Sequence, residues 1–276
     1  MNEEYQKWLN DRPNYKPLAK WNSGLVQEIL DRHPTLDEPF SGFTHRTIVG
    51  EPGCGKSIYA YKSVAKVHYT LNGFTKVDEE EESYKFALDN MIFHPIELFD
   101  RMLYQKKILR KPALAWILDD ASVHFGKQLF DMDRHTYRRL QGAMPTIRTA
   151  VTCLLITTPR IQLLAKPLRE FFDKKVEIKV IEHFQRPARL ARHYEKKFFP
   201  DDVRYRMRIP FQDYFSVLCP KPFFDWYFDK KIKAETDYLE KSISYGEPKE
   251  KIIEEKIIDI DKGSKEDDEE EPKDEY

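Results

Sequence analysis

Several features that define common protein classes are scarce or missing in this chain of 276 residues. Its three cysteines, Cys54, Cys153 and Cys219, are too few and too scattered for a disulfide framework or a zinc ligand set, which indicates a reducing compartment. No stretch approaches 18 apolar residues, so we expect no membrane span. Residues 1–5 are charged and do not form a secretion signal. We therefore expect a cytoplasmic protein.

Some catalytic signatures are also missing. The sequence has no Asn-Lys-x-Asp motif of the kind that specifies guanine, which argues against a GTPase. It has no Gly-x-Ser-x-Gly nucleophile elbow, and its eight histidines are scattered. Glycine is also sparse, with ten in the chain, yet three of these fall within six residues, at Gly50, Gly53 and Gly55.

Those glycines belong to a complete phosphate-binding loop, Gly-x-x-x-x-Gly-Lys-Ser. It comprises Gly50, Glu51, Pro52, Gly53, Cys54, Gly55, Lys56 and Ser57. A β-branched segment at 44–49 precedes it and a helical pattern follows at 58–67, which is the context such a loop needs. Backbone N–H groups would face the phosphates, Lys56 would reach the β- and γ-phosphates, and Ser57 would ligate Mg²⁺. The sequence therefore predicts a site for ATP and Mg²⁺.

Two adjacent carboxylates end the next buried segment. The apolar run at 112–118 leads into Asp119 and Asp120, about 60 residues after the loop. In this Walker B pattern Asp119 would hold Mg²⁺ together with Ser57, and Asp120 would be the catalytic acid that positions or deprotonates water. The alternative is that Asp120 only caps the helix after it.

Further candidates follow the strand expected at 149–156. Thr157 and Thr158 stand where a polar sensor would contact the γ-phosphate or the attacking water, although a simple turn before Pro159 is the alternative. Arg148, Arg160 and Arg169 could act in trans on a neighbouring subunit's nucleotide, and Arg169 is preferred. For each arginine, an ordinary surface position is the alternative.

The chain as a whole alternates strands with helices, which predicts an α/β fold. Together with the phosphate-binding loop, this pattern predicts a P-loop NTPase with a mostly parallel five-stranded sheet, helices on both faces, and a C-terminal β-hairpin and helix. The predicted parts are a helical extension at 1–43, the ATPase core at 44–182, the hairpin and helix at 183–245, and an acidic disordered tail at 246–276. Predicted helices include 21–33 and 161–172.

Charge is distributed unevenly along the chain. Residues 246–276 hold 14 acidic and 6 basic residues, whereas residues 1–245 hold 40 basic and 33 acidic ones. A basic body is compatible with a DNA partner. The candidate contacts are three arginine groups, each with a solvated charged face as the alternative: Arg134, Arg138 and Arg139; Arg186, Arg189 and Arg192; Arg204, Arg206 and Arg208.

Taken together, the loop at 50–57, the Asp119-Asp120 pair and the 156–159 sensor resemble the additional-strand, catalytic-acid ATPases. Their combination with the segments at 86–90 and 222–238 is similar to the DnaA-like AAA+ P-loop ATPases of crenarchaeal spindle-shaped viruses and related plasmids. The resemblance covers about 45–240. This chain lacks two features of DnaA itself, a C-terminal helix-turn-helix and the helical AAA+ lid.

This resemblance implies an ATP-hydrolysing protein that acts on DNA in replication of an archaeal virus or plasmid, in the host cytoplasm. It implies a homo-oligomer, with a hexamer as one form. Strands in place of the lid leave open a HerA/FtsK-type packaging or translocation motor. A third reading is a nucleotide-gated module that binds a partner protein through the aromatic helix and the tail.

Overall fold

The computed structural model describes residues 17–33, 42–76, 79–170, 174–183, 186–199 and 204–246, and the account below concerns these. The chain forms two compact units, Met1–Ala234 and Glu235–Tyr276. Of the second unit, only the end of one helix is described. Apart from Gly246, the predicted acidic tail lies outside the described residues, and the predicted domain limits stay predictions.

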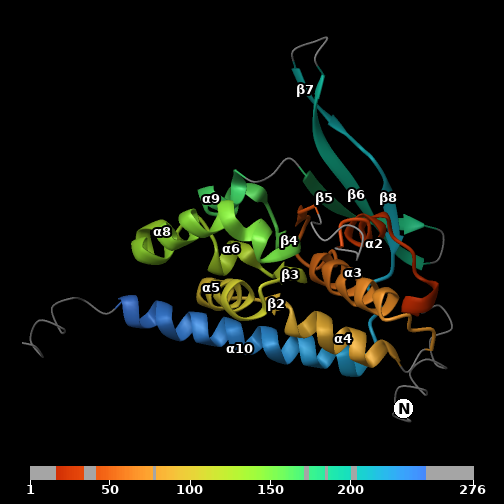
Figure 1. The fold of residues 1–276 in the computed structure, drawn as a ribbon, viewed down its shortest axis with the longest axis horizontal. Coiled ribbons are helices and arrows are strands. Elements are labelled where there is room, and N and C mark those ends of the chain that lie inside the picture. The colour runs from red at the N-terminus through yellow and green to blue at the C-terminus, as the bar shows by residue number, and fades with distance from the viewer. Residues whose placement is uncertain are drawn as a thin grey trace, which may run out of the picture. The chain divides into compact units, whose positions relative to one another are not determined.

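A single mixed sheet forms the centre of the first unit (Figure 1). Its described strands are β1 Thr44–Val49, β2 Met91–Ile92, β3 Ala113–Leu118, β4 Val151–Thr158, β5 Lys174–His183, β6 Arg186–Phe199, β7 Arg204–Arg208 and β8 Gln212–Phe215. They are ordered β2-β3-β4-β1-β5-β6-β7, and β8 also pairs with β6. Strands β1 to β5 are mutually parallel, which confirms the five-stranded parallel core.

The position of β4 defines the class of the fold. It lies between β1, which leads into the phosphate-binding loop, and β3, which leads into the two aspartates. This inserted strand is the additional strand that the family resemblance implied. The register pairs Leu118 with Ile156, so the residue after each, Asp119 and Thr157, is brought side by side at the carboxyl edge of the sheet.

Helices cover both faces of this sheet. Four of the described helices pack on one face: α2 Gly24–Leu30, α3 Lys56–Leu71, α4 Glu80–Asp89 and the start of α10 Lys221–Gly246. The other packs α5 Pro95–Tyr104, α6 Ala121–His124, α8 Arg134–Ala143 and α9 Lys166–Arg169. Side chains of β3 alternate between the two: Ala115 and Ile117 join the first core, and Trp116 and Leu118 join the second. Shorter pieces are η1 Leu18–Lys20, η3 Gln105–Leu109, α7 Leu129–Met132, η4 Met144–Thr149 and η5 Ile161–Leu163.

Two predicted helices are shorter than expected. The helix expected at 21–33 begins only at Gly24, because the Ser23 hydroxyl caps it by accepting from the N–H groups of Leu25 and Val26. Within the described residues 161–170, the helix expected at 161–172 is limited to Lys166–Arg169, and residues 171–172 lie outside the description. Pro167 is tolerated only in a first turn, so the chain forms the 3₁₀ turn η5 and then the four-residue α9, whose N-terminus carries that proline.

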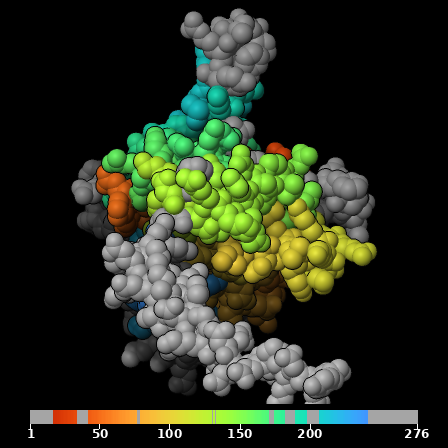
Figure 2. All heavy atoms as spheres, turned by 90° about the vertical axis from the view of Figure 1, so that its left-hand side faces the viewer, coloured from red at the N-terminus to blue at the C-terminus, as the bar shows by residue number. Residues whose placement is uncertain are grey.

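The predicted hairpin is part of the same sheet. Strand β6 pairs antiparallel with β5 from Lys174–Glu195 to His183–Arg186, and with β7 through pairs such as Lys197–Arg206. The connection between β6 and β7 lies outside the described residues. Strands β6 and β7 extend away from the helices as a two-stranded ribbon (Figures 1 and 2). Strand β8 was missed, because four residues that alternate exposed and buried carry a weak signal.

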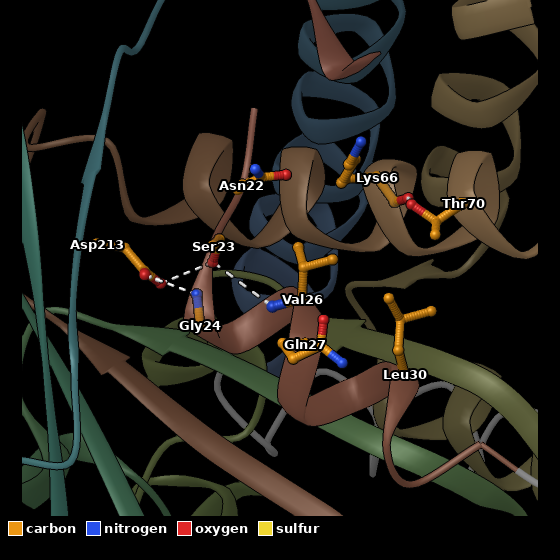
Figure 3. Close-up of a pocket in the computed structure, with 9 residues that line it drawn as sticks. All are labelled: Asn22, Ser23, Gly24, Val26, Gln27, Leu30, Lys66, Thr70 and Asp213. Carbon is orange, nitrogen blue, oxygen red and sulfur yellow. Dashed lines mark hydrogen bonds between the residues drawn. The ribbon is translucent and has the colours of Figure 1, made fainter. Parts of the chain in front are cut away.

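A buried polar cluster fastens α2 to β8. Asp213 accepts hydrogen bonds from the Ser23 hydroxyl at 2.6 Å, from the Gly24 N–H at 2.7 Å and from the Tyr59 hydroxyl at 2.5 Å. His193 approaches both Tyr59, at 2.9 Å, and Asp213, at 3.2 Å. The cluster borders a cavity of about 550 Å³ between α2 and α3 (Figure 3). These hydrogen bonds to Asp213 anchor the N-terminus of α2 to β8.

Within the described part of the chain, no helix combines the length and apolar character that a membrane crossing requires.

Candidate nucleotide-binding site

The phosphate-binding loop connects the end of β1 to the first turn of α3 and requires glycine at its start. Gly50 has φ 153°, and a Cβ there would lie 2.8 Å from the carbonyl oxygen of Ile178 on β5 and 2.7 Å from Cys54 Sγ. Any side chain would therefore push the loop off the neighbouring strand. The close contact between loop and β5 fixes where the backbone N–H groups lie.

The loop is closed around the ammonium group of Lys56. Nζ donates to the carbonyl oxygens of Gly50 at 3.0 Å and Glu51 at 2.8 Å, and the side chain is buried. Charged phosphate oxygens are stronger acceptors than neutral carbonyls. Lys56 is thus positioned to transfer from the loop's own carbonyls to a bound polyphosphate.

Ser57 and Asp119 meet at the carboxyl edge of the sheet. The Ser57 hydroxyl hydrogen-bonds to the fully buried Asp119 carboxylate. Asp119 Oδ1 also accepts from the Thr157 hydroxyl at 2.6 Å. Hydroxyl and carboxylate oxygens beside a phosphate-binding loop are the donor set that Mg²⁺ prefers. These two residues therefore fit the magnesium role predicted for them.

Burial raises the pKa of Asp119, and repulsion from Asp120 raises it further. Hydrogen bonds from Ser57 and Thr157 and the charge of Lys231 act in the opposite direction. Because burial and a neighbouring negative charge destabilise its ionised form, this carboxylate is stabilised more by a bound cation than a solvated carboxylate would be. The site is thus electrostatically prepared for a positive charge next to Asp119.

Asp120 occupies an unusual backbone conformation for a non-glycine residue. Its φ of 44° and ψ of 43° lie in the left-handed region, which turns its side chain away from the line of β3. Its N–H donates to Thr157 Oγ1 at 3.0 Å, and its carboxylate is only 22% exposed. Its C=O accepts from the Val123 N–H in the first turn of α6, and no side-chain cap hydrogen bond is present there.

Two residues of α10 complete the site, and sequence reasoning missed both. The Tyr227 hydroxyl donates to Asp119 Oδ2 at 3.0 Å, and the Lys231 ammonium forms an ion pair with Asp120. Tyr227 and Lys231 are four residues apart, so they lie on the same side of the helix. That spacing was visible in the sequence, but nothing in it said which surface the helix would cover.

The two threonines at the end of β4 are fully buried. Thr157 links the aspartates by donating to Asp119 and accepting from the Asp120 N–H. The Thr158 hydroxyl donates to the Arg160 carbonyl and closes the turn around Pro159. The sensor role stays a prediction for both.

The three candidate trans arginines all have exposed side chains. Arg148 lies in η4, and Arg169 ends α9. Arg160 lines a cavity of about 570 Å³ that the loop shares with β5. Arg160 is therefore next to this chain's own loop, whereas Arg148 and Arg169 are not among the residues lining that cavity. The trans role stays a prediction.

Arg189, a candidate DNA contact from its sequence, faces the loop instead. Its Nε donates to the Cys54 carbonyl oxygen at 3.2 Å. Burial raises the pKa of the Cys54 thiol, against the nearby charges of Lys56 and Arg189. Arg189 on β6 therefore supports the loop from the antiparallel part of the sheet, and its contact with DNA stays a prediction.

No protein-family model matches the sequence, and no significant match exists among curated proteins. Among solved structures, a KaiC-like protein from the archaeon Pyrococcus horikoshii is similar at 15% identity and a TM-score of 0.33, over 64% of this chain and 97% of that one. The N-terminal domain of zonular occludens toxin from Neisseria meningitidis is similar at 14% identity and a TM-score of 0.37, over 63% of this chain and 96% of that one. Both scores are low. The strand order, with β4 between the loop strand and the aspartate strand, is what shows a P-loop NTPase fold.

Proposed function

We propose that this protein binds and hydrolyses ATP with Mg²⁺. The observation that carries the proposal is the convergence of a phosphate-binding loop, the Ser57 hydroxyl and the Asp119-Asp120 pair at one edge of a sheet. These residue types in this arrangement serve phosphoryl transfer from a nucleoside triphosphate. The missing guanine motif favours ATP.

Each residue has a defined task in this proposal. The loop N–H groups and Lys56 bind the phosphates, and Ser57 and Asp119 hold the metal, which neutralises charge on the β- and γ-phosphates when bound. Asp120 accepts a proton from the attacking water. Thr157 keeps the two carboxylates in register, because its hydroxyl bonds to Asp119 and to the Asp120 backbone.

We further propose that the protein acts on DNA, in replication of an archaeal virus or plasmid. Support comes from the β6–β7 ribbon, which extends from the body and carries exposed cations, Lys196, Lys197, Arg206 and Arg208. Cations on a protruding element can contact the phosphate backbone. Assembly as a homo-oligomer, with a hexamer as one form, would let the exposed Arg169 reach a neighbour's nucleotide.

A DNA translocation or packaging motor of the HerA/FtsK type is the second candidate. The observation in its favour is that β6, β7 and β8 extend the sheet beyond β5. These strands lie in the part of the chain where the sequence showed strands instead of a helical lid. If the protein is such a motor, its rate of ATP hydrolysis should rise with the length of duplex DNA.

The test is ATP hydrolysis without DNA, with single-stranded DNA and with duplexes of increasing length, with Lys56→Ala as the blank. DNA-stimulated turnover that the variant loses is the expected result. Strong dependence on duplex length would favour the motor. ATP binding without turnover under any condition would contradict the ATPase proposal and support a nucleotide-gated module.

A further inference from the structure

Helix α10 contributes two side chains that each engage one of the two aspartates. Tyr227 donates its hydroxyl to Asp119 Oδ2 at 3.0 Å, and Lys231 pairs with Asp120. Both are at least partly buried: Tyr227 is 5% exposed, and the Lys231 side chain is 25% exposed. We call Tyr227 and Lys231 the α10 latch.

The latch engages one carboxylate oxygen of each aspartate that the proposed reaction needs, Oδ2 of Asp119 and Oδ2 of Asp120. A general base must offer a lone pair within hydrogen-bond reach of the attacking water. The Asp120 carboxylate instead faces an ammonium group. The buried Asp119 carboxylate is engaged on Oδ1 by Thr157 and on Oδ2 by Tyr227. Side chains of the protein itself thus engage both carboxylates.

The latch also supplies the positive charge that two adjacent carboxylates require. Lys231 is the cation paired with Asp120, and it also acts favourably on Asp119. Mg²⁺ bound to Ser57 and Asp119 would supply that charge in its place. The ammonium group and the metal therefore compete electrostatically for the same pair of acids.

The rest of the helix is attached by contacts that do not involve the site. Lys230 donates to the carbonyl oxygens of Leu88 and Met91 at 2.8 and 2.7 Å, and the ring of Phe223 stacks on Tyr84 at 4.6 Å. Loss of the latch therefore removes part of the attachment of α10 and leaves the contacts of Lys230 and Phe223 in place.

We propose that the α10 latch holds the two aspartates in a resting state, and that Mg²⁺-nucleotide binding breaks it. This inference rests on the proposed nucleotide site. Because coupling between two binding events is reciprocal, a change that weakens the latch strengthens nucleotide binding. The nucleotide state is thereby transmitted to α10.

The test compares Lys231→Met and Tyr227→Phe with Lys233→Met, which removes the same charge from an exposed position two residues along α10. We expect the latch variants to bind Mg·AMP-PNP about five-fold or more tightly than wild type, in the range usual for coupled sites, and to hydrolyse ATP faster. Lys233→Met should match wild type. A fall in kcat of ten-fold or more in Lys231→Met would instead make Lys231 a catalytic cation and overturn the latch.

Hydrogen exchange supplies a readout besides activity. In wild type, Mg·AMP-PNP should speed amide exchange across 221–234, and in Lys231→Met that exchange should be fast already without nucleotide. Lys56→Ala should show no nucleotide effect. Binding by wild type with unchanged exchange in this segment would overturn the latch alone. Failure of wild type and all latch variants to bind Mg·AMP-PNP would overturn the proposed function as well.

Discussion

At the scale of single residues, two glycines of the loop have similar backbones in different surroundings. Gly55 has φ 97°, and a Cβ there would lie 2.5 Å from Val217 Cγ1, whereas Gly53 has φ 76° and an open surrounding. Gly53→Ala should cost only the backbone strain, about 1–2 kcal/mol in the free energy of unfolding. Gly55→Ala should cost more, because Val217 must move. Urea unfolding without nucleotide measures both, and equal losses would contradict this account.

The buried position that Asp119 needs for its proposed role in the site lowers the stability of the folded protein. Burial and Asp120 raise its pKa in the folded protein above the usual 3.8. The folded state thus prefers the protonated acid, so a penalty appears as the pH rises past 3.8 and is complete above the raised folded pKa. Without Mg²⁺, Asp119→Asn should therefore raise Tm at pH 7 more than at pH 4, and it should abolish hydrolysis. Thermal unfolding at both pH values measures the difference. A Tm that falls at pH 7 would contradict the prediction.

At the scale of elements, one carboxylate fastens α2 to two strands. Glu28 accepts from Arg46 of β1 at 2.9 Å and from Lys174 of β5 at 2.7 Å. Burial opposes its ionisation, but Arg46 and Lys174 outweigh burial and hold the pKa at about 2. The stabilisation is therefore present above pH 4.5 and is lost as the pH falls towards about 2.

Glu28→Gln should accordingly lower the free energy of unfolding at pH 7 by about 3–5 kcal/mol, since it leaves Arg46, which is 2% exposed, without its partner charge. It should also flatten the acid dependence of stability between pH 4.5 and about 2. The control is Glu97→Gln on α5, which removes a more exposed pair with Arg101 and should cost about 0–1 kcal/mol. Denaturant unfolding across this pH range checks both. Equal losses in the two variants would show that the ion pairs of Glu28 with Arg46 and Lys174 do not anchor α2.

At the scale of the whole molecule, the β6–β7 ribbon is the feature that bears on a DNA partner. Lys197 and Arg206 are paired across it and therefore share one face. If that face contacts duplex phosphates, Lys197→Ala with Arg206→Ala should lower DNA affinity. It should also reduce the slope of log K against log salt by about 2. Salt titrations of DNA binding measure both. The control, Lys107→Ala with Lys111→Ala, removes two exposed charges elsewhere in the chain and should change little. Equal effects from both pairs would contradict a specific role for the ribbon.

The loop and the aspartate pair were predictable because their chemistry depends on residues that are neighbours in the chain. Gly50, Lys56 and Ser57 belong to one eight-residue loop, whose fixed spacing is what surrounds a phosphate. The apolar strand before Asp119 brings the acid to the same edge of a parallel sheet as the loop. Alternation of strands and helices then indicated the parallel core, whereas the inserted strand was implied by the family resemblance, and the strand order confirms both.

Contacts between distant segments depended on how the elements packed. Tyr227 lies 108 residues from Asp119, and Arg189 lies 135 residues from Cys54. A helical pattern reports that a face is buried but not what it is buried against, so the latch had no sequence signal. The sequence alone was sufficient to predict the phosphate-binding loop and the aspartate pair that meets it at one edge of the sheet. The covering of that site by α10 and its support by β6 follow from three-dimensional packing, which brings together charges that no local pattern relates.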